Sequence, residues 1–460
     1  MSADDRTLPA SPAHSTEKQP PYDPHADDTI RDGNNSIQSD VQLKDAEKGP
    51  STPPAQVNWG QDAPDGGLEA WLVIVGNWCA CFCSFGWINS IGTFEDYYSA
   101  ELLRGYSESD ISWIPSLQIF FMMAMGPVVG KIFDSYGPRW LMIGGSLLHV
   151  FGLMMASIST EYYQIMLSQG VCSAIGVASV FQAALACIGG WFNQKRGIAY
   201  GIAATGGSVG GVIFPIMVSR LIDEISFEWA MRISAFLILA LLVIATATVK
   251  TRTPPIPSRA TGDQFIQPLT EPAFVAVMIG IFLFTIGFFV PVTYLVVQGI
   301  SAGMDPDLAG YLVPILNAGS LFGRLLSGFA GDKIGRYNAF IIVCYITGIM
   351  VLALWIPASS DQAIIAFAVL FGFFSGAYIS LIAALIVQIS PLREIGIRTG
   401  LVFLLASIGG LTTGPMAGRI LDASGWDGVK IFAGVLCLAG TTFVLAARIK
   451  LAGPGLTTVF

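Results

Sequence analysis

After its first 69 residues, the chain consists of long, nearly uncharged apolar stretches separated by short polar segments. We place twelve such stretches, each close to the roughly 20 residues that a helix needs to cross about 30 Å of hydrocarbon. The apolar residues run continuously and do not alternate with polar ones, which excludes a transmembrane β-barrel. The sequence therefore predicts an all-α polytopic membrane protein with 12 transmembrane helices, at residues 71–93, 111–133, 140–158, 163–188, 198–222, 230–249, 274–297, 308–330, 339–356, 363–389, 401–421 and 429–447.

The composition divides the chain into segments of different kinds. Only 12% of the residues are charged, against about a quarter in soluble domains. Residues 1–69 are polar and rich in Ser, Pro and Asp, and we expect them to form a disordered cytosolic tail. We further expect six-helix bundles at 70–250 and 273–450, a cytosolic linker at 251–272 and a short cytosolic tail at 451–460.

The distribution of Lys and Arg predicts the orientation. If the N-terminus is cytosolic, the inner loops and helix ends carry 13 of these residues and the outer ones only five, namely Arg104, Arg220, Arg232, Arg419 and Lys430. Basic residues concentrate on the cytosolic side of membrane proteins. Both termini are therefore expected in the cytosol.

Two sequence marks recur at nearly the same spacing. Residues 130–137 read Gly-x-x-x-Asp-x-x-Gly, and the same pattern begins again 198 positions later at residue 328. Arg-x-x-Asp sequences begin at 220 and 419, which are 199 positions apart. This predicts two six-helix repeats packed about an axis along the membrane normal, an arrangement found in transporters.

The repeated pattern also supports a family resemblance. The segment from Gly130 to Arg139 resembles the signature loop between the second and third helices of the major facilitator superfamily. Residues 64–71, 92–98 and 191–201 resemble motifs of its fungal monocarboxylate-porter-like members, including the entry Pro-Asp-Gly-Gly-x-x-Ala-Trp. The resemblance spans about residues 64–450 and implies a major facilitator fold with solute transport by alternating access.

Four residues of the repeated loops are candidates for gating. Asp134 can pair with a basic group or a helix N-terminus of the neighbouring half and so hold one state of the gate. Arg139 completes the first loop, and Asp332 and Arg336 form the second. Arg336 stands one position early in its motif, which predicts a less regular contact there. A basic loop that only sets topology is the alternative interpretation.

Arg324 is the one strong charge expected deep inside a membrane span. Proton–lactate carriers of the resembling family have a Lys and an Asp at positions that here hold Asn89 and Ser320, while their Arg corresponds to Arg324. These replacements argue against a standard lactate–proton symporter. An intramembrane arginine normally faces a polar cavity and has a partner, so Arg324 is expected to bind an acidic group of the substrate; snorkelling towards the cytosol is the alternative.

Other polar side chains fall within the predicted spans. Asn89, Gln182, Asn317 and Tyr378 lie on spans that line the cavity by resemblance, and with Arg324 and Ser320 they are the candidate substrate-binding residues. Hydrogen bonding between helices explains such residues equally well. His149 is the only histidine outside the tail; it could titrate near neutral pH or be structural.

These observations predict a secondary active or facilitated transporter of a small organic solute, a monocarboxylate or a carboxylate-bearing metabolite. The alternatives are an exporter or importer of a neutral or heterocyclic secondary metabolite or vitamin, or a nutrient sensor without net flux. No metal-ligand spacing, cofactor motif or catalytic set is recognised, so an enzyme is not expected. The expected partners are the solute and the lipid bilayer, not nucleic acid, and we expect a functional monomer in the plasma membrane.

Overall fold

The computed structural model describes residues 63–252, 254, 255, 257, 262–455 and 458–460, and every regular element in this part of the chain is helical. Most of the predicted N-terminal tail and part of the predicted linker lie outside the described residues. The first half contains α2 (Leu68–Cys81), η1 (Phe82–Gly86), α3 (Ile91–Tyr97), η2 (Tyr98–Leu102), α4 (Glu108–Ile111), α5 (Trp113–Ala124), α6 (Gly126–Tyr136), α7 (Arg139–Ala156), α8 (Tyr162–Ile165), η3 (Met166–Ser173), α9 (Ala174–Trp191), α10 (Arg196–Glu224) and α11 (Phe227–Thr248).

The second half begins with a short helix within the predicted linker. Its elements are α12 (Gly262–Thr270), α13 (Pro272–Ser301), α14 (Pro306–Gly310), α15 (Leu312–Ile334), α16 (Arg336–Met350), η4 (Val351–Trp355), α17 (Asp361–Gln388), η5 (Leu392–Glu394) and α18 (Ile395–Ala452).

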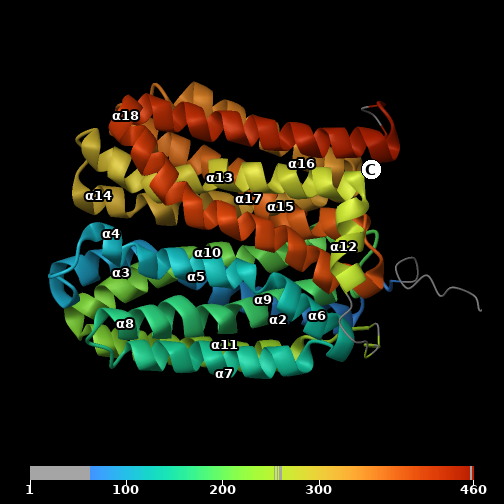
Figure 1. The fold of residues 1–460 in the computed structure, drawn as a ribbon, viewed down its shortest axis with the longest axis horizontal. Coiled ribbons are helices and arrows are strands. Elements are labelled where there is room, and N and C mark those ends of the chain that lie inside the picture. Colours follow the sequence, from blue (N-terminus) through green and yellow to red (C-terminus); the bar gives the residue numbers. More distant parts are fainter. Residues whose placement is uncertain (1–62, 253, 256, 258–261, 456–457) are drawn as a thin grey trace, which may run out of the picture. The chain divides into compact units, whose positions relative to one another are not determined.

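Within the described residues, 11 helical segments are long and apolar enough to cross a membrane. The first ten overlap the first ten predicted spans one to one. The eleventh, Leu392–Ala452, has 61 residues, which at about 1.5 Å per residue is roughly three times the hydrocarbon thickness. It covers both of the last two predicted spans. Gly425 interrupts its helical geometry with φ 67° and ψ −169°, and Figure 1 shows α18 turning back at the end where its label lies.

The first span is longer than predicted. It continues through α3 and η2 to Leu102, so Glu95 and Asp96, which follow the predicted span 71–93, lie on a helix. Aromatic packing explains the extension, because Phe94 and Tyr98 are buried and both contact the ring of Phe227 on α11. Hydropathy indicates only where the apolar stretch ends, near residue 93, whereas the helical segment continues to Leu102.

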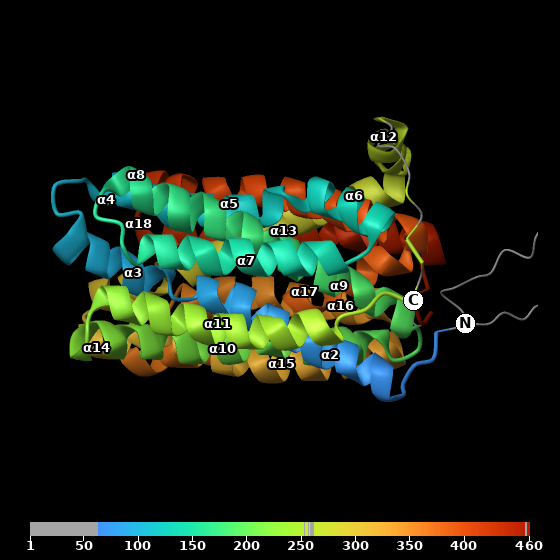
Figure 2. The same cartoon turned by 90° about the horizontal axis from the view of Figure 1, so that it is seen from below.

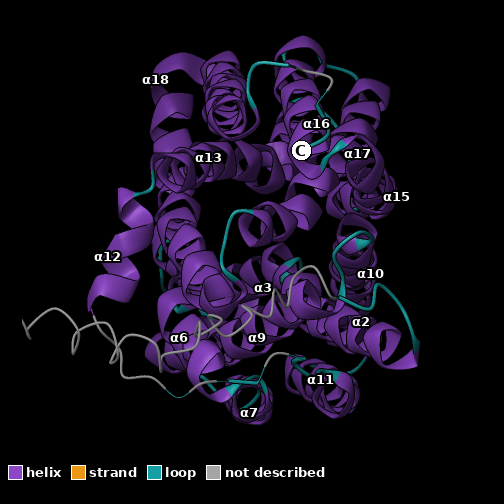
Figure 3. Cartoon of the chain, turned by 90° about the vertical axis from the view of Figure 1, so that its right-hand side faces the viewer, coloured by secondary structure: helices purple, strands orange, loops and turns teal. Residues whose placement is uncertain are grey.

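The described apolar side chains gather in two cores. One consists mainly of residues 70–249 and the other of residues 274–447. Between the two cores, α10 packs against α15, and α5 and α6 pack against α18. Figures 2 and 3 show α7 and α11 neighbouring each other on the outside of the helix bundle, away from these central contacts.

Glycines allow the closest helix contacts between these two sets of helices. A Cβ added at Gly130 would overlap the backbone of Gly396, and one added at Gly396 would overlap the backbone of Gly130. Gly197 and Gly328 have the same reciprocal relationship. So do Gly126 and Gly400. Small residues allow helix backbones to approach this closely in membranes, so these glycine pairs help to fix where the two halves meet.

Candidate functional site

Two small cavities lie between the halves, and Arg324 lines both of them. The first is also lined by Phe181, Phe288 and Tyr378, and the second by Asn89 and Asn317. The space open to the centre of a water molecule is about 40 Å³ in one and about 60 Å³ in the other, enough for a few waters. Apart from Arg324, the lining residues are uncharged, and most are apolar or aromatic. The centre of the protein is thus narrow, apolar and marked by one cation.

Arg324 is held inside the protein and does not extend to the end of the helix. Its side chain comes from α15, and the residue is only 4% exposed. Nε donates to Ser320 Oγ at 3.0 Å, and Nη1 donates to the carbonyl oxygen of Ala204 on α10. A guanidinium has five N–H groups, so donors remain for a solute in either cavity. The burial argues against snorkelling.

Asn89 and Asn317 meet across the second cavity. Asn317 Nδ2 donates to Asn89 Oδ1 at 2.9 Å and also to the carbonyl oxygen of Val313 at 3.0 Å. Asn89 Nδ2 donates to the carbonyl oxygen of Phe85 at 2.6 Å. The pair therefore links the first span to α15. In this narrow cavity, the side-chain amides of both residues are hydrogen bonded to the protein.

Tyr378 and Gln182 have different surroundings. The Tyr378 hydroxyl lies 2.6 Å from Thr285 Oγ1, and both residues line the first cavity. Gln182 is buried and lines neither cavity. Its Nε2 donates to the carbonyl oxygen of Met122 at 3.2 Å. The structure therefore brings five of the six candidate residues to the cavities and places Gln182 in a helix–helix contact.

His149 lies away from both cavities. It is buried on α7, and its Nδ1 is 2.9 Å from Ser173 Oγ of η3. Gly176 approaches the His149 backbone so closely that a Cβ there would overlap it. These contacts indicate that His149 packs between helices of the first half.

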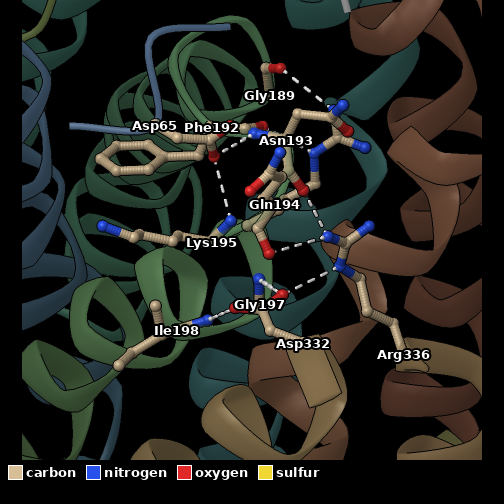
Figure 4. Close-up of polar contacts among 11 residues, drawn as sticks. Asp65, Gly189, Phe192, Asn193, Gln194, Lys195, Gly197, Ile198, Asp332 and Arg336 are labelled. Atoms are coloured by element: carbon tan, nitrogen blue, oxygen red, sulfur yellow. Dashed lines mark hydrogen bonds and ion pairs between the residues drawn. The ribbon is translucent and has the colours of Figure 1, made fainter. Parts of the chain in front are cut away.

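At one end of the bundle, Asp332 joins the two halves. Its Oδ1 accepts from the backbone N–H of Gly197 at 2.7 Å, and its Oδ2 accepts from that of Ile198 at 2.8 Å. Figure 4 shows the carboxylate against the first turn of α10. Free N–H groups and the helix dipole both favour an anion at this position.

Arg336 reinforces the same contact. Its Nε donates to Asp332 Oδ1 at 3.3 Å, and its Nη2 donates to the carbonyl oxygens of Asn193 and Gln194. One side chain therefore bridges the acidic residue of its own half and the loop before α10 (Figure 4). Arg336 stands one position early in its motif, which predicted a less regular contact, and in the structure it reaches both groups.

Asp134 makes the equivalent contact in the other direction. Its two carboxylate oxygens accept from the backbone N–H groups of Gly396 at 3.0 Å and Ile397 at 2.9 Å, in the first turn of α18. Arg139, in contrast, is an exposed residue at the start of α7. The structure therefore places Asp134, Asp332 and Arg336 at contacts between the halves, and Arg139 outside them.

The opposite end of the bundle is hollowed. A groove of about 880 Å³ is lined by residues of α3, η2, the last turns of α10, and α14. Its side chains include the acids Asp96, Glu101, Asp223 and Asp307, with Arg220. Figure 1 shows α3 and α14 at the end away from α6 and α12. The halves are thus in contact at one end and separated by a groove at the other.

Asp65 holds the loop before α10, a role that its sequence motif did not predict. Its Oδ1 accepts from the backbone N–H groups of Asn193 at 2.7 Å and Lys195 at 3.0 Å. Asp65 has φ 51°, and Gly67, two residues later, has φ 90°. Its carboxylate holds the loop whose carbonyl groups accept from Arg336 (Figure 4). Asp and Gly are turn-forming residues, but a partner 128 positions away could not be read from the Pro-Asp-Gly-Gly sequence.

Arg398 and Glu271, which the sequence motifs did not single out, form an ion pair at the same end of the bundle. Arg398 is buried near the start of α18 and donates to both carboxylate oxygens of Glu271, at 2.8 and 2.6 Å. It also donates to Glu394 at 3.0 Å. These hydrogen bonds from Arg398 lower the pKa of Glu271. The pair ties the start of α13 to the helix end that holds Asp134.

The sequence matches the Major Facilitator Superfamily model at residues 76–360 and 277–455. It is 60% identical over 399 residues to the MFS transporter asaE of Aspergillus flavus, covering 86% of this chain and 90% of that protein. It is 52% identical over 421 residues to the Fujikurins efflux protein of Gibberella fujikuroi, covering 91% and 89%. The Agnestins efflux protein AgnL12 of Paecilomyces divaricatus is 40% identical over 383 residues, with coverage of 83% and 88%.

Solved structures share the fold. The Escherichia coli fucose:proton symporter FucP superposes with a TM-score of 0.63 at 15% identity, covering 81% of this chain and 98% of that one. The human organic anion transporter MFSD10 (TETRAN) gives a TM-score of 0.65 at 13% identity, with coverage of 82% and 100%. At these identities, the likeness concerns the fold alone.

Proposed function

Because this chain belongs to the Major Facilitator Superfamily, whose members are multi-pass membrane transporters and not enzymes, we propose that it exports an amphipathic secondary metabolite. The observation that carries the proposal is the central lining, in which aromatic and aliphatic side chains surround the single cation Arg324. Such a lining suits a solute with a large apolar part and one acidic or hydrogen-bond-accepting group. Two relatives named as efflux proteins, for fujikurins and for agnestins, support export.

This proposal replaces the expected monocarboxylate with a larger solute. The relatives support membership of the superfamily but do not single out its monocarboxylate porters. Asn89 and Ser320, which stand where the resembling lactate carriers have charged residues, fit a less polar cargo. A carboxylate-bearing metabolite remains the second candidate, because Arg324 is the only charged residue lining the cavities described here.

The proposed topology has twelve spans, with the bend at Gly425 dividing α18 into the last two. The chain then forms two six-helix bundles, about residues 70–250 and 273–450, with both termini in the cytosol and the carrier acting as a monomer in the plasma membrane. In this orientation the contacts of Asp134 and Asp332 close the cytosolic end, and the groove near α14 faces outward. Release of these contacts would admit the solute to Arg324 from the cytosol.

The test is flux from proteoliposomes loaded with labelled solutes: an apolar carboxylic acid, its neutral amide and a short monocarboxylate. The wild type is compared with Arg324→Ala, Arg324→Lys and, as a control outside the cavities, Gln182→Ala. The proposal predicts movement of the apolar acid with little movement of the short one, and about tenfold or greater loss in Arg324→Ala, since a charge-assisted hydrogen bond contributes about 1.5–3 kcal/mol. Equal flux in the wild type and both Arg324 variants would contradict the assigned role of Arg324.

A further inference from the structure

A long groove lies on the outside of the first half, between α7 and α11. Its volume is about 810 Å³. Residues 139, 143, 146 and 147 contribute from α7, and residues 239, 242, 243, 246 and 247 from α11. This i, i+4, i+7 spacing places one face of each helix along the groove. Figures 2 and 3 show both helices at the periphery of the bundle, where hydrocarbon would cover them.

The groove is amphipathic along its length. Leu147, Val243 and Leu239 line the part towards the middle of the helices, and Leu147 and Val243 are 61% and 60% exposed. Arg139 and Lys250 line the other end, one at the first residue of α7 and the other just beyond the last residue of α11. An apolar channel that ends in two cations at a helix boundary matches the polarity of a phospholipid with an acidic headgroup.

The two cations line the end of the groove but have no acidic partner among the residues that the structure describes. Neither Arg139 nor Lys250 takes part in an ion pair or a side-chain hydrogen bond there. The carbonyl oxygen of Lys250 accepts from Trp191 Nε1 at 2.8 Å, which fixes the backbone from which its side chain extends. Both residues are exposed.

The second half shows what its corresponding cations bind. Lys250 and Arg448 are 198 positions apart, the spacing of the repeated glycine–aspartate motif. Arg448 donates to Asn338 Oδ1 and to the carbonyl oxygens of Gly453, Gly455 and Thr458.

The other cation of the second half is also satisfied by the protein. Arg336, which starts α16 as Arg139 starts α7, binds Asp332 and the loop before α10. In the second half the chain itself thus supplies oxygen acceptors to both cations. In the first half, the described residues supply none.

We propose that the groove between α7 and α11 binds an anionic glycerophospholipid of the cytosolic leaflet. Arg139 and Lys250 contact the anionic headgroup, and one acyl chain lies along Ile143, Leu147, Leu239 and Val243. Two cations with separate attachment points favour a headgroup that carries net negative charge over a zwitterionic one. The site is distinct from the central cavities and does not depend on which solute is carried.

The test is native mass spectrometry of the full-length protein in detergent, titrated with palmitoyl-oleoyl phosphatidylserine or with phosphatidylcholine of the same chains. The wild type is expected to retain phosphatidylserine several-fold more tightly. Each cation removed, in Lys250→Gln and Arg139→Gln, is expected to weaken retention about fivefold. The control Lys333→Gln removes an exposed cation of α15 that lies over the Phe329 ring and should leave retention unchanged.

The acyl part of the site is tested separately. Val243→Trp fills the groove without changing charge and should also reduce phosphatidylserine retention, whereas Val435→Trp, at a residue of α18 that is 51% exposed, should not. Thermal unfolding without added lipid should be equal in all variants. Equal retention of the two lipids by the wild type would overturn the proposal. So would unchanged retention in Lys250→Gln, or displacement by soluble sn-glycerol 3-phosphate at equal concentration.

Discussion

Asp134 and Asp332, 198 positions apart, make the same contact in opposite directions: each accepts from the backbone N–H groups of the second and third residues of a helix in the other half. Each carboxylate therefore acts as an N-terminal cap supplied from outside the helix. A pair of equivalent contacts related by the internal repeat is suited to closing one end of the bundle and to being released together.

Replacement of Asp332 should loosen this end. In Asp332→Asn, one backbone N–H loses its acceptor and the helix N-terminus loses its counter-charge. We expect the Gly197 and Ile198 amides to exchange hydrogen about tenfold faster, equivalent to roughly 1.4 kcal/mol. Hydrogen–deuterium exchange of peptides covering the start of α10 measures this. An unchanged exchange rate, with the far end of α10 as internal reference, would contradict a contact between the halves in solution.

Asp134→Asn should loosen the same end of the bundle and thereby affect transport. Since Asp134 lines neither central cavity, we expect slower turnover while solute binding in the wild-type range is kept. Flux from proteoliposomes and equilibrium binding to the same preparation provide the comparison. A parallel loss of binding and flux would argue that Asp134 maintains the fold and does not control the gate.

Gly328→Ala should prevent the two halves from closing fully. The added Cβ would overlap the backbone of Gly197, and overpacking of this kind costs about 1–3 kcal/mol. Gly414→Ala on α18, where nothing lies within 4 Å of the new Cβ, is the matched control. Thermal unfolding and exchange at the start of α10 should change only in Gly328→Ala. Equal behaviour of both variants would show that the glycine contact is not closed in the membrane.

Glu271 makes stability at this end depend on pH. Because Arg398 lowers the pKa of Glu271, the pair stabilises the folded state above the carboxyl's ordinary pKa. That contribution is lost as pH falls through the lowered value. The Glu271 side chain is 40% exposed, so solvent screening limits the effect to about 1 kcal/mol. Glu271→Gln should therefore unfold at a lower temperature than the wild type at pH 7, and the difference should vanish under acidic conditions. A difference that grows on acidification would contradict this sign.

Asn317→Ala removes the side-chain link between Asn89 and α15. A net hydrogen bond contributes about 0.5–1.5 kcal/mol, so the apparent solute affinity should change about three- to tenfold. Asn77→Ala, whose amide bonds only within its own helix to Val73, is the control. If the two variants transport alike, the pair does not contribute to the cavity.

Much of the helix pattern could be predicted from hydropathy, because lipid demands long apolar helices whatever their neighbours are. The extension of the first span to Leu102 could not, since it depends on Phe94 and Tyr98 packing against Phe227. The last two spans were separated in the sequence, whereas the helix is interrupted only at Gly425. Local composition predicts where a membrane span is possible, and tertiary packing decides where the helix ends.

The candidate site was predictable to a different degree. Arg324 and the two repeated aspartates could be found because charges within or beside apolar stretches are conspicuous. The backbone partners of Arg336 and Asp65 could not be found, because they are carbonyl and N–H groups of the loop before α10 and carry no sequence signature. In the sequence, Gln182 is equivalent to Asn317, since both are polar residues within predicted spans. The structure separates them, because Asn317 faces a cavity and Gln182 faces a neighbouring helix.

The most direct test of the proposed carrier is counterflow in proteoliposomes that contain the wild-type protein. Labelled apolar acid is supplied outside vesicles that contain either buffer or an excess of the same unlabelled acid. Alternating access predicts saturable uptake that the internal solute accelerates, with both features strongly reduced in Arg324→Ala. Uptake that rises linearly with concentration and is unaffected by internal solute would contradict a carrier mechanism.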